Sequence, residues 1–200
     1  MNKIVLFTQR VEYIESYKER RDAIDQNIVS LLLECGYTPI PVPNNIKALE
    51  KILEVLKPNG IFLTGGNSLV KYGGNAPERD EVDSYLIAYS VNTKTPLLGI
   101  CRGMQSILDY YDVPLVNVTN HVAVRHEVKN NNKKMIVNSY HNQGCVAMNS
   151  SELETCFLSN DNVVEMVKHK TLPIVGIMWH PERENPFKDD DIKLIKELFN

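Results

Sequence analysis

The first hundred residues alternate short apolar runs with segments whose apolar residues recur at helical spacing. The apolar runs are residues 3–8, 38–42, 61–63 and 97–100, and the helical segments are residues 24–32, 46–56 and 82–89. Parallel strands need a crossover connection, usually a helix, between one strand and the next. The alternation therefore predicts an α/β fold, in which helices cover both faces of a central, mostly parallel sheet.

The second half of the chain contains mainly short runs of β-prone residues. These runs are residues 115–118, 135–137, 145–147, 163–164 and 174–179. We expect them to extend one edge of the sheet or to form a small second sheet, with 129–134 as an exposed turn. Apolar residues at helical spacing over 189–199 predict a closing helix. No repeat or linker composition interrupts the chain, so residues 1–200 are predicted to form one domain.

Composition and charge exclude several classes of function. A chain of 200 residues with 43% hydrophobic residues and a net charge of −3 has no electrostatic basis for binding nucleic acid or an anionic membrane. No apolar run is long enough for a signal peptide or a membrane span, so we expect a cytoplasmic protein, as a monomer or homodimer. The four cysteines lack metal-type spacing and are expected to be free thiols.

One cysteine stands between two glycines at the end of an apolar run. Gly99 precedes Cys101 by two residues, Gly103 follows it by two, and a helical pattern begins after it. Small residues on both sides suit a sharp strand-to-helix turn that exposes a nucleophile, and the helix N-terminus favours the thiolate. The alternative is a buried strand cysteine, which is the commoner environment of cysteine.

A second glycine-rich turn, Gly65-Gly66-Asn67, follows the apolar run 61–63. Ligands of open parallel sheets bind at the carboxyl ends of the strands, so both turns are predicted to border one site. An acyl-transfer enzyme needs donors for the oxyanion of its tetrahedral intermediate. The backbone N–H groups of Gly66 and Arg102 are the candidates.

A cysteine nucleophile needs a base, and His180 is the best-placed histidine. It follows the run 174–179, and Glu182, two residues later, can orient its ring, which predicts a Cys101–His180–Glu182 triad. The alternative is that His180 merely ends a strand and that Glu182 is a solvated acid. His141, in a polar stretch, is the second candidate for the base.

Three other polar side chains cluster in the sequence: His121, Arg125 and His126. They suit an anionic group, or equally a charged edge strand that resists aggregation. No pair of histidines has the spacing of a known metal motif, and Gly65-Gly66 lacks the lysine of a phosphate-binding loop, so we expect neither metal nor cofactor.

Four stretches resemble motifs of the class I glutamine amidotransferase superfamily. They are Thr64-Gly65-Gly66, Gly99-Ile100-Cys101-Arg102-Gly103-Met104-Gln105, Ser139-Tyr140-His141 and Trp179-His180-Pro181-Glu182. Their order and separation fit, and the resemblance covers nearly the whole chain. It is closest to the γ-glutamyl hydrolase branch, and it implies a single flavodoxin-like, three-layer domain.

The resemblance also implies roles for these residues. Cys101 would attack the γ-carbonyl of a small γ-glutamyl substrate and form a thioester, with His180 and Glu182 as its partners and without a cofactor. The oxyanion would be held at Gly66 and Arg102. The residues that would contact the glutamyl group are Gly65, Gln105, Asn138, Ser139, Tyr140 and His141.

The chain is shorter than the larger hydrolases of this branch, because the segment between Tyr111 and His121 is compressed. This departure puts γ-aminobutyrate in doubt as the leaving group. The short form is similar to bacterial hydrolases of γ-glutamyl-CDP-amidate, which serve capsule phosphoramidate synthesis. A phosphorylated leaving group would need cations, and the candidates are Arg10, Arg20, Arg21, Arg79, Arg102, His121 and Arg125. Most of these are equally suited to a solvated surface or to an internal ion pair such as Arg79 with Asp83.

Two other classes remain open. A glutaminase subunit would deliver ammonia to a separate synthetase, and its hydrolysis of glutamine would rise when that partner is added. A non-catalytic binding module of the same fold is disfavoured, because all three triad positions are filled.

Overall fold

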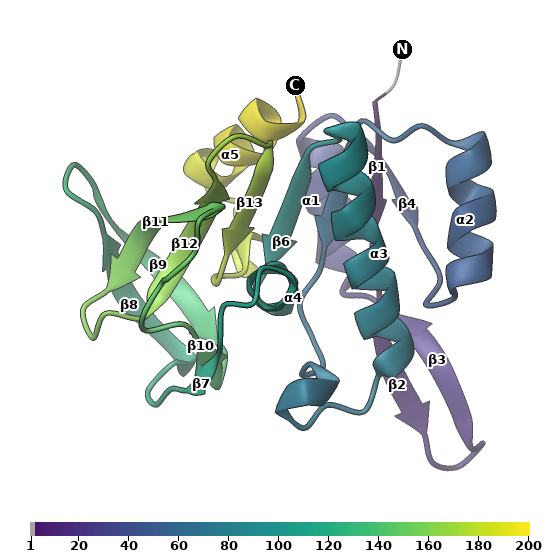
Figure 1. Cartoon of the computed structure of the whole chain (residues 1–200), viewed down its shortest axis with the longest axis horizontal. Helices are drawn as coiled ribbons and strands as arrows, with labels where there is room; N and C mark the ends of the chain where they lie inside the picture. Colours follow the sequence, from purple (N-terminus) through teal and green to yellow (C-terminus); the bar gives the residue numbers. More distant parts are fainter. Residues whose placement is uncertain (1–2) are drawn as a thin grey trace.

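The computed structural model describes residues 3–200, which form a nine-stranded central sheet with helices on both faces (Figure 1). Along the sheet the strand order is β4-β1-β5-β6-β13-β12-β11-β8-β9. The first five of these strands pair in parallel, and the remaining four join by antiparallel pairs. The strands are β1 (Ile4–Phe7), β4 (Thr38–Pro41), β5 (Gly60–Leu63), β6 (Leu97–Ile100), β8 (Val122–Lys129), β9 (Lys134–Tyr140), β11 (Leu153–Ser159), β12 (Val164–His169) and β13 (Ile174–Ile177).

Five α-helices complete the three layers. Two apolar clusters pack against the sheet, one on each face. Leu49, Leu86 and Ile107 belong to the first cluster, and Leu31 and Phe199 belong to the second. The first cluster places α2 (Ile46–Val55), α3 (Pro77–Thr93) and α4 (Arg102–Tyr110) on one face, and the second places α1 (Gln26–Glu34) and α5 (Asp189–Phe199) on the opposite face. The predicted three-layer α/β fold is confirmed.

The helix boundaries follow from their caps. The side chain of Asp25 accepts a hydrogen bond from the backbone of Asn27 and so begins α1, which leaves Ile24 outside the helix, although the predicted helix included it. Asn45 caps α2 in the same way, through the N–H of Ala48. Short 3₁₀ helices occur at η1 (Val70–Tyr72) and η2 (Pro181–Arg183).

Both expected arrangements of the C-terminal strands occur. Strands β12, β11, β8 and β9 extend the sheet edge, on the left of Figure 1, and β7 (Val116–Asn117) pairs with β10 (Gln143–Gly144) as a small separate sheet. The expected strand at 145–147 is wrong, because pairing with β7 ends at Gly144. Strand β11 was not expected, and β8 was expected only as a charged edge strand, the alternative given for the stretch around Arg125; in the sheet β8 lies between β11 and β9. Both strands mix apolar and polar side chains that are mostly half-buried or exposed, so cross-strand pairing rather than an apolar run defines them.

A hairpin of β2 (Arg10–Ile14) and β3 (Glu19–Ala23) projects from the body at the lower right of Figure 1. The charged stretch 17–22 gave no strand signal, because its side chains are exposed on both faces. Within residues 3–200, no helix combines the length and the apolar character that crossing a membrane requires.

Candidate active site

The sheet places the two glycine-rich turns side by side. Leu63 at the end of β5 pairs with Gly99 of β6, so the loop after β5 and the turn after β6 leave the same edge together. Strand β13 flanks β6 on its other side, with Ile177 opposite Ile100. The segment after β13, which carries His180, therefore emerges next to Cys101.

Cys101 forms a strained turn between β6 and α4. Its backbone angles are φ 48° and ψ −105°, an unfavourable region for a residue with a Cβ atom. Surrounding packing holds this conformation. A Cβ on Gly103 would lie 2.2 Å from the carbonyl oxygen of Leu63, and one on Gly99 would lie 2.5 Å from the backbone of Gly103. Both glycines are thus required by close backbone contact.

His180 and Glu182 are buried and joined by a hydrogen bond. Nδ1 of His180 lies 2.7 Å from Oε1 of Glu182, while Nε2 has no hydrogen-bond partner among the described residues. Gly65 lies against the same ring, since a Cβ at Gly65 would be 2.8 Å from Cε1 of His180 and 3.7 Å from Cβ of Cys101. The structure therefore brings Cys101, His180 and Glu182 together at one site.

The charge of His180 depends on these neighbours. Burial by itself lowers the pKa of the ring, but electrostatic and hydrogen-bond interactions with Cys101 and Glu182 outweigh burial and raise the pKa of His180 from 6.5 to about 9. An imidazolium beside a thiolate is the reactive pair of cysteine hydrolases.

The loop after β5 is held from beneath by a buried arginine. Arg79 of α3 donates from Nη2 to the carbonyl oxygens of Thr64 (2.7 Å) and Gly65 (2.9 Å), and from Nη1 to the carbonyl of Gly66. Because Arg79 fixes the carbonyls of this loop, the peptide of Gly66 is held rigidly, at φ +86°. Its N–H group is therefore available as a fixed donor for an oxyanion. Arg79 is fully buried and both of its terminal nitrogens bond to this loop, so our interpretation of it as a contact for the leaving group is corrected.

The side chain of Arg102 is also internal. It forms ion pairs with Asp83, which is equally buried, and with Asp80. The guanidinium is thereby unavailable to a ligand, contrary to the expectation for an exposed cation. The backbone N–H of Arg102 opens α4 and has no intrahelical acceptor, so it remains a candidate oxyanion donor.

A pocket of about 230 Å³ adjoins Cys101 and His180. Gly66, Gln105, Tyr140 and His141, four residues predicted from the sequence, line it. Gln105 donates to the carbonyl of Gln143 at 2.9 Å, and Tyr140, 39% exposed, lies edge-on to His180 with ring centroids 5.7 Å apart. These side chains are positioned to meet a small polar ligand.

Asn138 and Ser139 have other partners. Asn138 bonds to both the carbonyl and the N–H of His180, each at 2.8 Å, and Ser139 donates to the carbonyl of His121 at 2.7 Å. Both are buried. We therefore correct their assignment: Asn138 fixes the backbone that carries His180, and Ser139 closes the strand pair β8–β9.

The remaining cations predicted for the leaving group are dispersed. Arg125 pairs with Glu184, Arg21 with Glu19 and Arg20 with Glu78, while His121 is buried beside Asp161. Arg10 also forms a surface ion pair, with Glu12, but it packs against Gly66 and borders the site. For the other cations, the alternative interpretation fits better: each lies on a solvated surface or forms an internal ion pair.

Arg183 was missed by the sequence reasoning. It is exposed, stacks on Tyr140 at 4.0 Å from the ring centroid, and lines both the main pocket and a smaller hollow of about 50 Å³ that His180 also lines. Arg10 lines that smaller hollow as well. The signal in the sequence that could have identified Arg183 is its position directly after Glu182.

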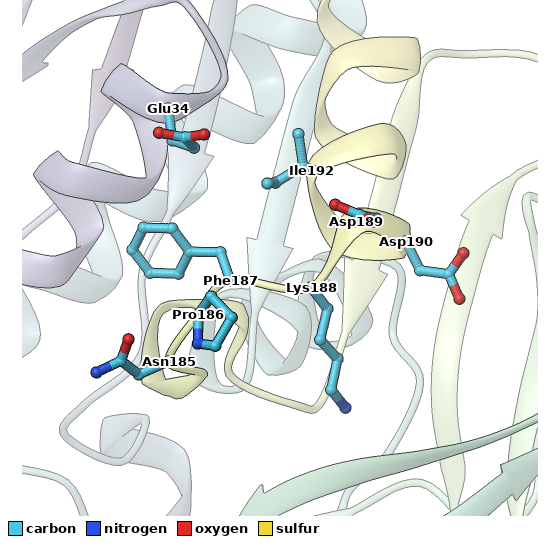
Figure 2. Close-up of a pocket in the computed structure, with 8 residues that line it drawn as sticks. All are labelled: Glu34, Asn185, Pro186, Phe187, Lys188, Asp189, Asp190 and Ile192. Atoms are coloured by element: carbon cyan, nitrogen blue, oxygen red, sulfur yellow. The ribbon is translucent and has the colours of Figure 1, made fainter.

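A larger hollow, about 920 Å³, lies elsewhere, between the end of α1 and the start of α5. Figure 2 shows Glu34 above the ring of Phe187, with Asp189 and Asp190 on α5. The described residues that line it include no nucleophile or histidine, so we assign no chemistry to it.

Comparison with known proteins defines the class. Residues 17–195 match the family model described as glutamine amidotransferase class-I, and the chain belongs to that family. It is similar to the γ-glutamyl-CDP-amidate hydrolase of Campylobacter jejuni, with 35% identity over 96% of each chain. Identity to the γ-glutamyl-γ-aminobutyrate hydrolase of Escherichia coli O157:H7 is 28%, covering 80% of this chain and 78% of that one.

Among solved structures, a putative GMP synthase component from Thermoplasma acidophilum superposes with a TM-score of 0.73 at 18% identity. The match covers all of this chain (100%) and 94% of the other. At this identity the likeness concerns the fold alone. The comparisons confirm the family and the fold expected from the sequence, and the expectation of an enzyme.

Proposed function

We propose that the protein hydrolyses a γ-glutamyl amide through a glutamyl thioester on Cys101. The observation that carries this proposal is the meeting of Cys101, on its strained turn, with the His180–Glu182 pair in one pocket. Sγ of Cys101 bonds to the γ-carbonyl carbon, the C–N bond breaks, and the leaving amine takes a proton from His180. Water then gives a proton to His180 and its oxygen bonds to the carbon, and the C–S bond breaks to release glutamate.

The N–H groups of Gly66 and Arg102 stabilise the oxyanion of both tetrahedral intermediates. Gln105 and Tyr140 contact the glutamyl group, as does the backbone of the segment that follows Tyr140. A pocket of about 230 Å³ is smaller than a drug-sized ligand requires. The leaving group therefore extends outward, past Arg183.

The narrower proposal is that the substrate is γ-glutamyl-CDP-amidate, cleaved to glutamate and cytidine diphosphoramidate. Its support is the similarity to the Campylobacter jejuni enzyme over nearly the full length of both chains. Arg183, which lines the pocket, and Arg10, which lines the smaller hollow beside His180, supply guanidinium groups suited to a diphosphate.

The test is a coupled assay of glutamate release from three substrates: glutamine, γ-glutamyl-γ-aminobutyrate and γ-glutamyl-CDP-amidate. We expect fast release from the CDP-amidate, slow release from glutamine, and none from Cys101→Ala. Release from other γ-glutamyl amides but not from the CDP-amidate would exclude the narrower proposal. Release only from glutamine, increased by a synthetase partner, would favour a glutaminase subunit. Activity that survives in Cys101→Ala would exclude the mechanism.

A matched pair of variants tests the cations. Arg183→Gln should raise KM for the CDP-amidate about tenfold and leave KM for glutamine unchanged, because one charge-assisted phosphate contact is worth roughly 1.5 kcal/mol. Arg21→Gln is the control, since its side chain pairs with Glu19 on the projecting hairpin. Equal KM values for Arg183→Gln and the parent would place the leaving group elsewhere.

A further inference from the structure

Two histidines and a glutamate meet in the interior of the C-terminal strands, behind the pocket wall. His121 precedes β8, His141 follows β9 and Glu165 lies in β12. All three side chains are almost completely buried, with 2%, 3% and 0% of their surface exposed. The proposed hydrolysis gives none of their side chains a chemical role. A cluster of this composition in the interior needs its own explanation.

The three inward atoms form a nearly equilateral triangle. Nδ1 of His121 lies 3.2 Å from Nε2 of His141 and 3.3 Å from Oε1 of Glu165, and Nε2 of His141 lies 3.4 Å from the same oxygen. A tetrahedral zinc ion bound at about 2.0–2.1 Å keeps its ligand atoms about 3.3 Å apart. The triangle thus has the dimensions of three corners of a zinc coordination tetrahedron.

The outward nitrogen of each histidine has its own acceptor. Nε2 of His121 lies 3.0 Å from a carboxylate oxygen of Asp161, and Nδ1 of His141 lies 3.1 Å from the carbonyl of Gln143. These acceptors place the proton on the outer nitrogen of each ring, so that the inner nitrogen presents a lone pair to the centre. Histidines that bind metals are oriented in this way.

The carboxylate of Glu165 is otherwise unsatisfied. Neither of its oxygens has a hydrogen-bond partner among residues 3–200, and three imidazole nitrogens, those of His121, His126 and His141, approach Oε1 only to 3.3–3.5 Å. Charge-assisted hydrogen bonds are shorter, at about 2.7–2.9 Å. A buried anion without close donors is costly unless a cation accompanies it.

We propose that His121, His141 and Glu165 bind a zinc(II) ion. Two imidazoles and a carboxylate are an established donor set for zinc, although no spacing motif in the sequence indicates it. The ion would join the start of β8, the end of β9 and β12. Because Tyr140 and Gln143 adjoin His141, it would also hold the pocket wall in place.

The test measures bound metal in protein without a histidine tag, in a Cys101→Ala background that removes the thiol of the main pocket. After incubation with zinc and desalting, we expect about one zinc ion per chain, and a higher Tm than for the chelated protein. Glu165→Gln in the same background should abolish retention. His169→Asn is the matched control, since its ring contacts Thr171 and Leu172 outside the cluster, and it should retain zinc fully.

Cobalt(II) provides a readout that needs no variant of the cluster, in case Glu165→Gln does not fold. The Cys101→Ala protein should develop the intense visible bands of tetrahedral cobalt without a thiolate charge-transfer band. Either of two results overturns the proposal: the Cys101→Ala protein retains no zinc and leaves cobalt octahedral, or folded Glu165→Gln retains as much zinc as its parent. The first result would mean that protonated imidazoles alone balance Glu165.

Discussion

Nδ1 of His180 lies 2.7 Å from Oε1 of Glu182, two residues later, and both side chains are shielded from solvent. The short η2 helix that begins at Pro181 turns the chain back, so that a near neighbour in sequence can reach the ring. The carboxylate thereby orients the imidazole and stabilises its charged form.

Glu182→Gln should lower the pKa of His180, because it removes one of the negative charges that hold that pKa at about 9. The parent needs protonated His180 to release the amine, so kcat/KM should fall as the pH rises through about 9. In the variant the fall should begin at lower pH, and kcat should drop about 10²–10⁴-fold. The pH profile of kcat/KM is the measurement, with Glu127→Gln as the control, because Glu127 is half-buried and pairs with Lys134 of the neighbouring strand. An unchanged alkaline limb would contradict the role of Glu182.

The same ion pair should make stability depend on pH. His180 binds its proton more tightly in the folded chain (pKa about 9) than in the unfolded chain (6.5), so its contribution is complete below pH 6.5 and is lost as the pH rises through about 9. The free energy of unfolding from urea titrations should therefore decline across this window. The free energy of unfolding of His180→Gln should decline less over the same pH range. Parallel curves for the two proteins would refute the assignment.

Asp83→Asn should destabilise the fold by about 3 kcal/mol, because it leaves the buried guanidinium of Arg102 short of a charged partner. Half-buried Asp80 still pairs with Arg102, which keeps the loss from being larger. Urea unfolding measures the change. Glu54→Gln, which breaks an exposed pair with Lys51, should cost less than about 0.5 kcal/mol. Similar losses of stability for the two variants would mean that the buried ion pair stabilises the fold no more than the exposed one.

Gly103→Ala should destabilise the fold by about 3 kcal/mol, since the new Cβ would lie 2.2 Å from a carbonyl oxygen of β5, which cannot move without disturbing the sheet. Gly73→Ala is the matched control. It has φ +88° and no atom within 4 Å of the added Cβ, so only backbone strain of about 1 kcal/mol should appear. Thermal or urea unfolding compares the two. A harmless Gly103→Ala would show that α4 does not need this close approach.

Arg79→Lys should impair catalysis while the chain stays folded. A single ammonium cannot bond to the carbonyls of Thr64, Gly65 and Gly66 at once, so the N–H of Gly66 would lose its fixed direction. We expect kcat for glutamate release to fall about 10²-fold with little change in KM, the pattern of a lost oxyanion donor. Circular dichroism establishes folding. A rise in KM alone would instead assign Arg79 to substrate binding.

Local sequence patterns determined much of this protein. The alternation of apolar runs and helical segments predicts the parallel half of the sheet, because each pattern reflects which face of a single element is buried. Gly99 and Gly103 around Cys101 predict the sharp turn, since only glycine permits such close backbone contact. Nearness in sequence likewise predicts the pairing of His180 with Glu182.

Tertiary structure alone decided what depends on contacts between distant segments. The sequence pattern around a polar residue does not indicate which distant residue it will bond to. The sequence therefore did not reveal that Arg79 lies under the loop after β5 or that Asn138 bonds to the backbone of His180. Charged strands such as β8 form because a neighbour completes their hydrogen bonds. Likewise His121, His141 and Glu165 converge only when β8, β9 and β12 take their places in the sheet, because the free energy that buries them comes from the assembled sheet rather than from any one segment.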